Sequence, residues 1–134
     1  MPIAVWSYRY ETGIDLVDAQ HQALFEAVNR LADSFKEGKA KDQVKVSLDF
    51  LVDYTREHFQ TEERFMREVG YPRLAEHMVE HVRLMEQVRD LQMDLADGKA
   101  VTMDVTIFLA DWLKVHIHES DLDYVRYLRE PRQN

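Results

Sequence analysis

The chain has 134 residues, of which 46% are hydrophobic and 31% charged, and its formal net charge is −8. This length fits one domain with a proper core, and the acidic charge argues against nucleic acid or an anionic membrane surface as a partner. The absence of cysteine excludes disulfides and thiolate metal sites, so nitrogen and oxygen ligands must hold any metal.

The sequence carries no recognisable membrane or targeting segment. No apolar run approaches the ~20 residues needed to span a bilayer. The stretch MPIAVWSYRYE lacks the basic and apolar regions of a signal peptide. We therefore expect a cytoplasmic protein without a membrane anchor, and no obligate protein partner is evident.

The first 17 residues are expected to form an arm that packs on the domain, because they are too apolar for a loose tail. Their apolar side chains include Trp6, Tyr8, Tyr10, Ile14 and Leu16. Asp18 is the expected N-cap of the first helix. From there apolar residues recur at helical spacing as far as Phe35, and Gly38 suits the residue that ends the helix.

Three further amphipathic helices follow this one. The second is expected to begin near Asp42 and to stop at Gly70, and Pro72 suits the first turn of the third. The third ends at the turn formed by residues 97–99. Thr102 is the expected N-cap of the fourth helix, which runs to Arg129 before a frayed tail over residues 130–134.

These elements predict an all-α fold. Four helices of roughly 20 to 28 residues would each be about 30 to 40 Å long. Because the connections are short, neighbouring helices should be antiparallel. The expected architecture is a single domain: an up-down-up-down four-helix bundle over residues 18–129, with an N-terminal arm over residues 1–17.

Polar residues interrupt the apolar faces of all four predicted helices. Burying such groups without strong partners costs a few kcal/mol each and would erase a typical net stability. Taken singly they are weak signals, since a lone histidine is more often a hydrogen-bonded helix residue than a ligand. Together they indicate a metal site in the bundle core. The seven candidate ligands are His21, His58, Glu62, His77, His81, His116 and Asp121.

Five imidazoles and two carboxylates are too many for a single ion, since a zinc ion takes four ligands. Two ions of octahedral geometry fit if Glu62 and Asp121 each bridge both ions, together with a bridging solvent oxygen. One ion then receives three histidines and the other two, which leaves an open position on the second. Nitrogen and oxygen ligands at octahedral positions suit iron. We therefore expect two non-haem iron ions joined by an oxo or hydroxo bridge.

The stretch VHIHESDLDY contains two overlapping His–Asp pairs with the same five-residue spacing. In an α-helix, His116 and His118 point about 200° apart. His116 continues the predicted buried face, which includes Phe108 and Trp112, whereas His118 lies on the polar side with Asp123 nearby. We therefore expect His116 and Asp121 to be the ligand pair, placed on flanking edges of the inner face.

The chain resembles the hemerythrin family, and its bacterial single-domain members most closely. The resemblance rests on four stretches that span nearly the whole chain: WSYRYETGIDLVDAQH (6–21), HFQTEE (58–63), GYPRLAEHMVEH (70–81) and DWLKVHIHESDLDY (111–124). It implies a di-iron centre that binds O₂ reversibly. In that arrangement Glu62 and Asp121 bridge, one iron is closed and the other is open. The closed iron takes His77, His81 and His116, and the open iron takes His21 and His58.

The resemblance also implies an O₂ pocket beside the open iron. Its wall would consist of Leu24, Phe59, Trp112, Leu113, Ile117 and Tyr124. Such a stripe is also ordinary core packing, and both interpretations can hold together. The hydroxyl of Tyr124 has two expected orientations, into the pocket or toward solvent. Gln20 and Gln22 are candidates for hydrogen bonds to the ligands.

The leading functional hypothesis is an O₂-binding protein for delivery, storage or sensing, and not an enzyme. The predicted wall contains no acid or base besides the ligands, which argues against strong catalysis. One alternative is a di-iron enzyme that reduces peroxide or nitric oxide. Another is a bundle in which the metal buffers iron or stabilises the structure.

Overall fold

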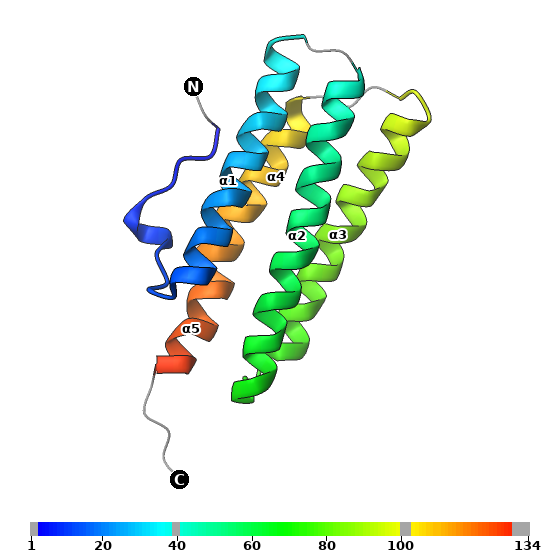
Figure 1. Cartoon of the computed structure of the whole chain (residues 1–134). Helices are drawn as coiled ribbons and strands as arrows, with labels where there is room; N and C mark the ends of the chain where they lie inside the picture. The colour runs from blue at the N-terminus through cyan, green and yellow to red at the C-terminus, as the bar shows by residue number, and fades with distance from the viewer. Residues whose placement is uncertain (1–2, 39–40, 100–102, 130–134) are drawn as a thin grey trace.

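The computed structural model describes residues 3–38, 41–99 and 103–129. A short 3₁₀ turn, η1 (Tyr8–Tyr10), precedes four long helical rods. The first three are α1 (Asp15–Lys36), α2 (Lys41–Val69) and α3 (Leu74–Ala96). The fourth rod consists of α4 (Met103–Val115), a π-helical segment η2 (His116–Asp121) and α5 (Leu122–Arg129). Figure 1 shows these rods side by side, with α5 continuing the direction of α4.

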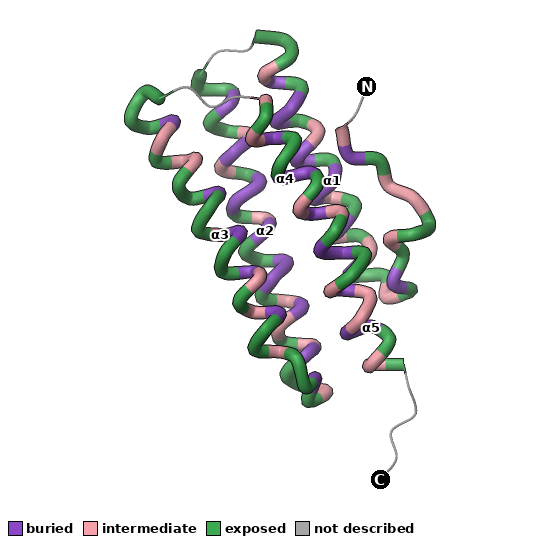
Figure 2. Tube along the Cα trace, turned by 180° about the vertical axis from the view of Figure 1, so that it is seen from behind, coloured by how far each residue is buried: buried purple, intermediate pink, exposed green. Residues whose placement is uncertain are grey.

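The expected all-α bundle is confirmed. Helix α1 packs against α2 and α4, and α2 also packs against α3. The buried positions of each helix face the interior between the rods (Figure 2). None of the described helices combines the length and the apolar content needed to cross a membrane.

The N-terminal arm packs on α1. The Asn29 side chain makes two hydrogen bonds to the backbone of Ala4. Its amide NH2 donates to the Ala4 carbonyl (2.8 Å), and its amide oxygen accepts from the Ala4 N–H (2.9 Å). The rings of Trp6 and Tyr10 lie 5.3 and 5.2 Å from the ring of Phe25. Apolar content thus keeps this segment on the bundle.

The predicted N-cap of the first helix is wrong. Helix α1 begins at Asp15, so Asp18 lies inside its first turn. The carboxylate of Asp18 instead accepts hydrogen bonds from the arm: 2.8 Å from the Thr12 amide, 2.7 Å from its hydroxyl and 3.1 Å from the amide of Gly13. Asp18 therefore ties the arm to α1 rather than starting the helix.

The other helix ends lie close to the positions predicted from the Gly and Pro residues, with small differences. Gly70 has a φ of 67°, the left-handed conformation expected where the second helix stops. Helix α3 begins at Leu74, so Pro72 lies in the preceding turn rather than in the helix. The predicted cap Thr102 and the tail over residues 130–134 lie outside the described residues.

Phe108 was expected on the buried face of the fourth helix, but it is 46% exposed. The buried stripe of α4 contains Thr106 and Ala110 instead. Thr106 and Phe108 point about 200° apart on an α-helix, so burying one exposes the other.

Candidate metal centre

The seven predicted ligands converge from all four rods into one buried cluster. His21 comes from α1, His58 and Glu62 from α2, His77 and His81 from α3, and His116 and Asp121 from η2. Each is at most 4% exposed. Their ligand atoms form two compact groups that share both carboxylates: His77, His81 and His116 in the first, His21 and His58 in the second.

Asp121 turns one oxygen toward each group. Its Oδ1 lies 2.9 Å from Nε2 of His77 and 3.1 Å from Nε2 of His116. Its Oδ2 lies 3.0 Å from Nε2 of His21. The Asp121 carboxylate is therefore placed to bridge two metal ions, one beside each histidine group.

Glu62 also reaches both groups. Its Oε1 lies 2.8 Å from Nε2 of His58 and 3.8 Å from Nε2 of His81. Its Oε2 lies 3.7 Å from Nε2 of His21. The division into three and two histidines around shared carboxylates matches the one expected from the ligand count.

Several of these atoms are buried without a hydrogen-bond partner among the described residues. They include Nε2 of His58 and His77, both ring nitrogens of His21, Oε1 of Glu62 and both oxygens of Asp121. Burying so many unpaired polar atoms is costly, and native proteins contain few of them. Nitrogen and oxygen donors that face one another in this way fit a pair of metal ions, and the donor set suits iron.

The electrostatics of the metal-free cluster are those of paired opposite charges. Burial alone would lower the pKa of His21, but Asp121 and Glu62 raise it to about 9. Burial would likewise lower the pKa of His116, yet Asp121 and Glu80 help raise it to about 10. Burial and mutual repulsion oppose ionisation of the two carboxylates, but the imidazoles hold the pKa values of Glu62 and Asp121 below their usual range.

The free energy of unfolding of the metal-free protein should therefore fall as the pH rises. The raised pKa values of His21 and His116 add to the free energy of unfolding. This contribution is complete below about pH 6.5 and is lost as the pH rises toward 9 to 10. The lowered pKa values of the carboxylates contribute stability that is lost only in acid. Denaturant titrations at about pH 6, 8 and 9.5 should show a loss of a few kcal/mol. A flat profile would mean that both imidazoles are neutral in the folded protein.

The π-helical segment explains the spacing of His116 and Asp121. Five residues of α-helix would leave the two side chains about 140° apart, which is the basis of the expected placement on flanking edges. That expectation is wrong. A π turn closes one residue later than an α turn, as in the hydrogen bond from the Leu122 amide to the Ile117 carbonyl. The two side chains therefore share a face, 3.1 Å apart.

The second His–Asp pair lies outside the cluster. His118 is exposed, as predicted. Asp123 is only partly exposed, because it accepts a 2.7 Å hydrogen bond from the Tyr71 hydroxyl and pairs with Arg73. The two residues do not contribute to the buried ligand groups.

Further polar side chains contact the outer nitrogens of three imidazoles. Gln20 Oε1 lies 2.6 Å from Nδ1 of His58, whereas Gln22, the other candidate, is exposed. Glu63 Oε2 lies 2.8 Å from Nδ1 of His81. Glu80 Oε2 lies 3.5 Å from Nδ1 of His116. Such partners fix the orientation of a liganding imidazole and raise its basicity.

Sequence reasoning missed Glu63 and Glu80. The available signal was their position next to a ligand in the sequence, after Glu62 and before His81. A neighbour in sequence lies about 100° around the helix from the ligand, which turns it toward the adjacent rod. That geometry becomes informative only when the adjacent rod is known.

Three of the six residues predicted for the O₂ wall line a small cavity. Leu24, Phe59 and Leu113 line a cavity of about 20 Å³. Its other lining residues are Leu51, Thr55, Leu84, Val88 and Leu109. Ile117 is fully buried in the same core cluster, and Trp112 is partly buried against it. A volume of this size admits about one small molecule.

The aromatic rings of Phe59 and Trp112 stack on imidazoles of two predicted ligands. The Phe59 ring lies 3.6 Å from that of His81, with an angle of 4° between the planes. The Trp112 ring lies 4.4 Å from that of His116, with an angle of 14°. These contacts hold the two imidazoles in place while covering them with apolar surface.

Tyr124 lies elsewhere, with its hydroxyl pointing neither into the cavity nor toward solvent. It is fully buried in a second cluster with Met66, Tyr71 and Val125. Its hydroxyl donates a 2.7 Å hydrogen bond to Oε2 of Glu62. Burial and this carboxylate raise the pKa of Tyr124 well above its usual value, so the hydroxyl keeps its proton.

Replacing Tyr124 with phenylalanine should leave Oε2 of Glu62 without its donor. Because a buried hydrogen bond to a charged group is lost, the free energy of unfolding should fall by about 1 to 3 kcal/mol. Denaturant titration of the metal-free variant measures this loss. Tyr127→Phe is the matched control, since that hydroxyl reaches the Gly70 carbonyl at the surface. Equal effects of the two changes would contradict a special role for the Tyr124 contact.

Comparison with known proteins identifies the family. Residues 12–128 match the model of the hemerythrin HHE cation binding domain. Bacteriohemerythrin from Methylococcus capsulatus is 36% identical, with 92% of this chain and 95% of the relative covered. Bacteriohemerythrin from Stenotrophomonas maltophilia is 32% identical, with 92% and 80% covered.

Solved structures agree with this assignment. A wild-type hemerythrin crystal structure superposes with a TM-score of 0.88 and 35% identity, covering 94% of this chain and 98% of that one. A hemerythrin variant with one leucine changed to alanine gives a TM-score of 0.91 and 34% identity, with 97% and 100% covered. The chain therefore belongs to the hemerythrin family, whose members are O₂-binding proteins with non-haem iron rather than enzymes.

Proposed function

We propose that this protein binds O₂ reversibly at two non-haem iron ions, for delivery, storage or sensing of oxygen. In this proposal His77, His81 and His116 hold one ion, and His21 and His58 hold the other. Glu62 and Asp121 would each serve both ions. The ions supply the open coordination position and the two electrons that O₂ binding requires.

The placement of Asp121 is the observation that carries the proposal. Its two oxygens are divided between a group of three histidines and a group of two. A bridge with unequal numbers of partners supports one closed ion and one open ion. The unpaired buried donors support the same interpretation, because ions would satisfy them.

The apolar cavity adjoins residues of both ligand groups. Leu24 lies one turn after His21 and Thr55 one turn before His58, just as Leu84 lies one turn after His81 and Leu113 one turn before His116. None of the residues lining this cavity is ionisable. An apolar wall excludes water and supplies no proton donor, so it favours holding a small apolar molecule over converting it.

The proposal is tested by metal analysis together with optical spectra. Protein reconstituted with ferrous iron without oxygen should contain two irons per chain. On exposure to O₂ it should gain a ligand-to-iron charge-transfer band, which should disappear and return through repeated cycles of deoxygenation. One irreversible oxidation with no recovery, or fewer than two irons per chain, would contradict the proposal.

Leu113→Ala should alter how O₂ is held. The change enlarges the cavity and weakens the exclusion of water, so both O₂ release and irreversible oxidation should be faster. Stopped-flow release and the decay of the oxygenated spectrum measure these rates. A core leucine-to-alanine change also costs about 2 to 5 kcal/mol. Leu48→Ala is the matched control, since Leu48 is also a buried core leucine but does not line the cavity. Identical oxygen kinetics in both variants would refute a role for Leu113.

A further inference from the structure

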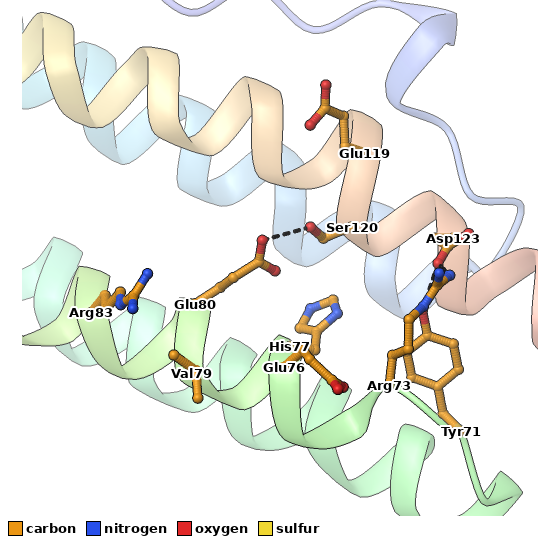
Figure 3. A pocket seen from close by; sticks show the side chains of 10 residues that line it. All are labelled: Tyr71, Arg73, Glu76, His77, Val79, Glu80, Arg83, Glu119, Ser120 and Asp123. Carbon is orange, nitrogen blue, oxygen red and sulfur yellow. Dashed lines mark hydrogen bonds and ion pairs between the residues drawn. The ribbon is translucent and has the colours of Figure 1, made fainter.

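Glu80 connects α3 to the π-helical segment at two points. Its Oε1 accepts a 3.0 Å hydrogen bond from the Ser120 hydroxyl, and its Oε2 lies 3.5 Å from Nδ1 of His116. Figure 3 shows the Glu80 side chain reaching from α3 toward Ser120 across the gap between the two rods. Both partners belong to η2, so a single carboxylate contacts the segment near its start and near its end.

Glu80 also lies at the boundary between the metal centre and a surface pocket. The pocket has a volume of about 480 Å³ and is lined by His77 and Glu80 on α3 and by Glu119 and Ser120 on η2. The Glu80 side chain is 45% exposed, whereas that of His116 is 3% exposed. The carboxylate therefore stands between a buried imidazole and solvent.

His116 needs an acceptor on its outer nitrogen. Its Nε2 faces Asp121 and His81, at 3.1 and 3.0 Å. Its Nδ1 is buried and has no hydrogen bond within the described part of the chain. The Glu80 carboxylate at 3.5 Å is slightly beyond ordinary hydrogen-bond length. By contrast, His58 and His81 have outer partners at 2.6 and 2.8 Å.

The π segment needs external support as well. A π turn is rare because an uninterrupted α-helix is the favoured conformation. Single π turns occur mostly within α-helices and frequently at functional sites. The segment here places His116 and Asp121 on one face, and Asp121 serves both ligand groups. Any return to α-helical winding would separate those two side chains.

We propose that Glu80 is a positioning residue that keeps η2 in its π-helical form and orients the His116 imidazole toward the centre. It links the rod bearing His77 and His81 to the segment bearing His116 and Asp121. The structural part of this inference concerns the metal-free chain, and only its effect on iron rests on the proposed function.

The structural part is tested on metal-free protein by hydrogen exchange and NMR. In Glu80→Ala, the amide of Leu122, which closes the π turn on Ile117, should exchange faster by on the order of tenfold. The Nδ1–H signal of His116 should shift or broaden. Glu80→Gln keeps one acceptor oxygen for His116, and its amide can donate to the Ser120 hydroxyl, so it should restore most of the protection of the Leu122 amide; the His116 signal should still shift, because the carboxylate charge is lost. Ser120→Ala should affect the Leu122 amide more than the imidazole signal.

Glu76→Ala is the matched control, because Glu76 lies one turn earlier on α3, lines the same pocket and is exposed. Equal Leu122 exchange and equal His116 signals in Glu80→Ala and Glu76→Ala would overturn the proposal. If Glu80→Ala does not fold, the His116 signal in Glu80→Gln decides, and an unchanged signal overturns it.

A second readout uses iron-loaded protein. Glu80→Ala should hold less iron than Glu76→Ala at the same free iron concentration, by about 10- to 100-fold in affinity. If the metal-free readouts change as expected while the wild-type protein shows no reversible O₂ binding, the proposed function fails and the role of Glu80 stands. If O₂ cycling succeeds and the metal-free readouts do not change, the role of Glu80 fails alone.

Discussion

His116→Ala should abolish the O₂-dependent spectrum, whereas His118→Ala, two residues later, should leave it intact. Nε2 of His116 lies 3.1 Å from Asp121 and 3.0 Å from Nε2 of His81, at the centre of the ligand cluster. Its loss removes one imidazole from the three-histidine group and one of the three imidazoles beside Asp121. His118 is exposed and touches none of the other candidate ligands. Iron content should fall below two per chain only in His116→Ala.

His58→Ala completes this comparison on the other ligand group. His58 lies 2.8 Å from Oε1 of Glu62, and its loss leaves His21 as the only imidazole of the two-histidine group. We expect about one iron per chain and no reversible O₂ binding. Metal analysis and anaerobic titration with O₂ provide the measurements. Retention of two irons and of cycling in His58→Ala would show that the ligand assignment is wrong.

Removing the iron should lower the melting temperature by on the order of 10 to 20 °C. Ions that bind only the folded chain stabilise it by mass action, and here they would also satisfy donors that are otherwise buried without partners. Calorimetry of protein before and after anaerobic chelation measures the difference. His118→Ala should show the same loss as the wild type.

The same experiment on His58→Ala gives the contrasting case. With one iron at most, its melting temperature should depend less on chelation than that of the wild type. Equal melting temperatures for iron-loaded and iron-free wild-type protein would mean that the ions contribute nothing to the folded state. In that case the paired charges of the metal-free cluster alone would hold the centre together.

The bundle and the convergence of the seven polar residues were predictable because both follow from helical periodicity. Each predicted ligand interrupts an apolar stripe, and a stripe at three- and four-residue spacing must face the core. The partition around Glu62 and Asp121 came from counting donors, which requires no coordinates. Each of these predictions uses only the residue pattern within single helices and the number of donors.

Features that depend on two elements together were not predictable in this way. Asp18 was expected to cap α1, but it bonds the backbone of the arm, whose path the sequence does not specify. Phe108 was assigned to the core from its helical spacing with Trp112, but α4 is rotated so that Phe108 is 46% exposed. Glu63 and Glu80 act across the gap between neighbouring rods.

The π segment escaped prediction for a different reason. Any count of helical phase assumes 3.6 residues per turn, so a local change in winding is invisible to it. The warning signal was the five-residue spacing itself, since ligands on one helix face normally lie three or four residues apart.

The extra residue of the π segment also determines where Tyr124 points. In a continuous α-helix, Tyr124 would lie about 80° around the axis from His116, to the side of the cluster. With one residue absorbed by the π turn, the offset falls to roughly 20°. The same change in winding that brings Asp121 beside His116 therefore aims the Tyr124 hydroxyl at Oε2 of Glu62. Deleting His118 would therefore let the rod wind as an α-helix throughout, with His116, Asp121 and Tyr124 still on one face: the extra residue and the π turn compensate each other.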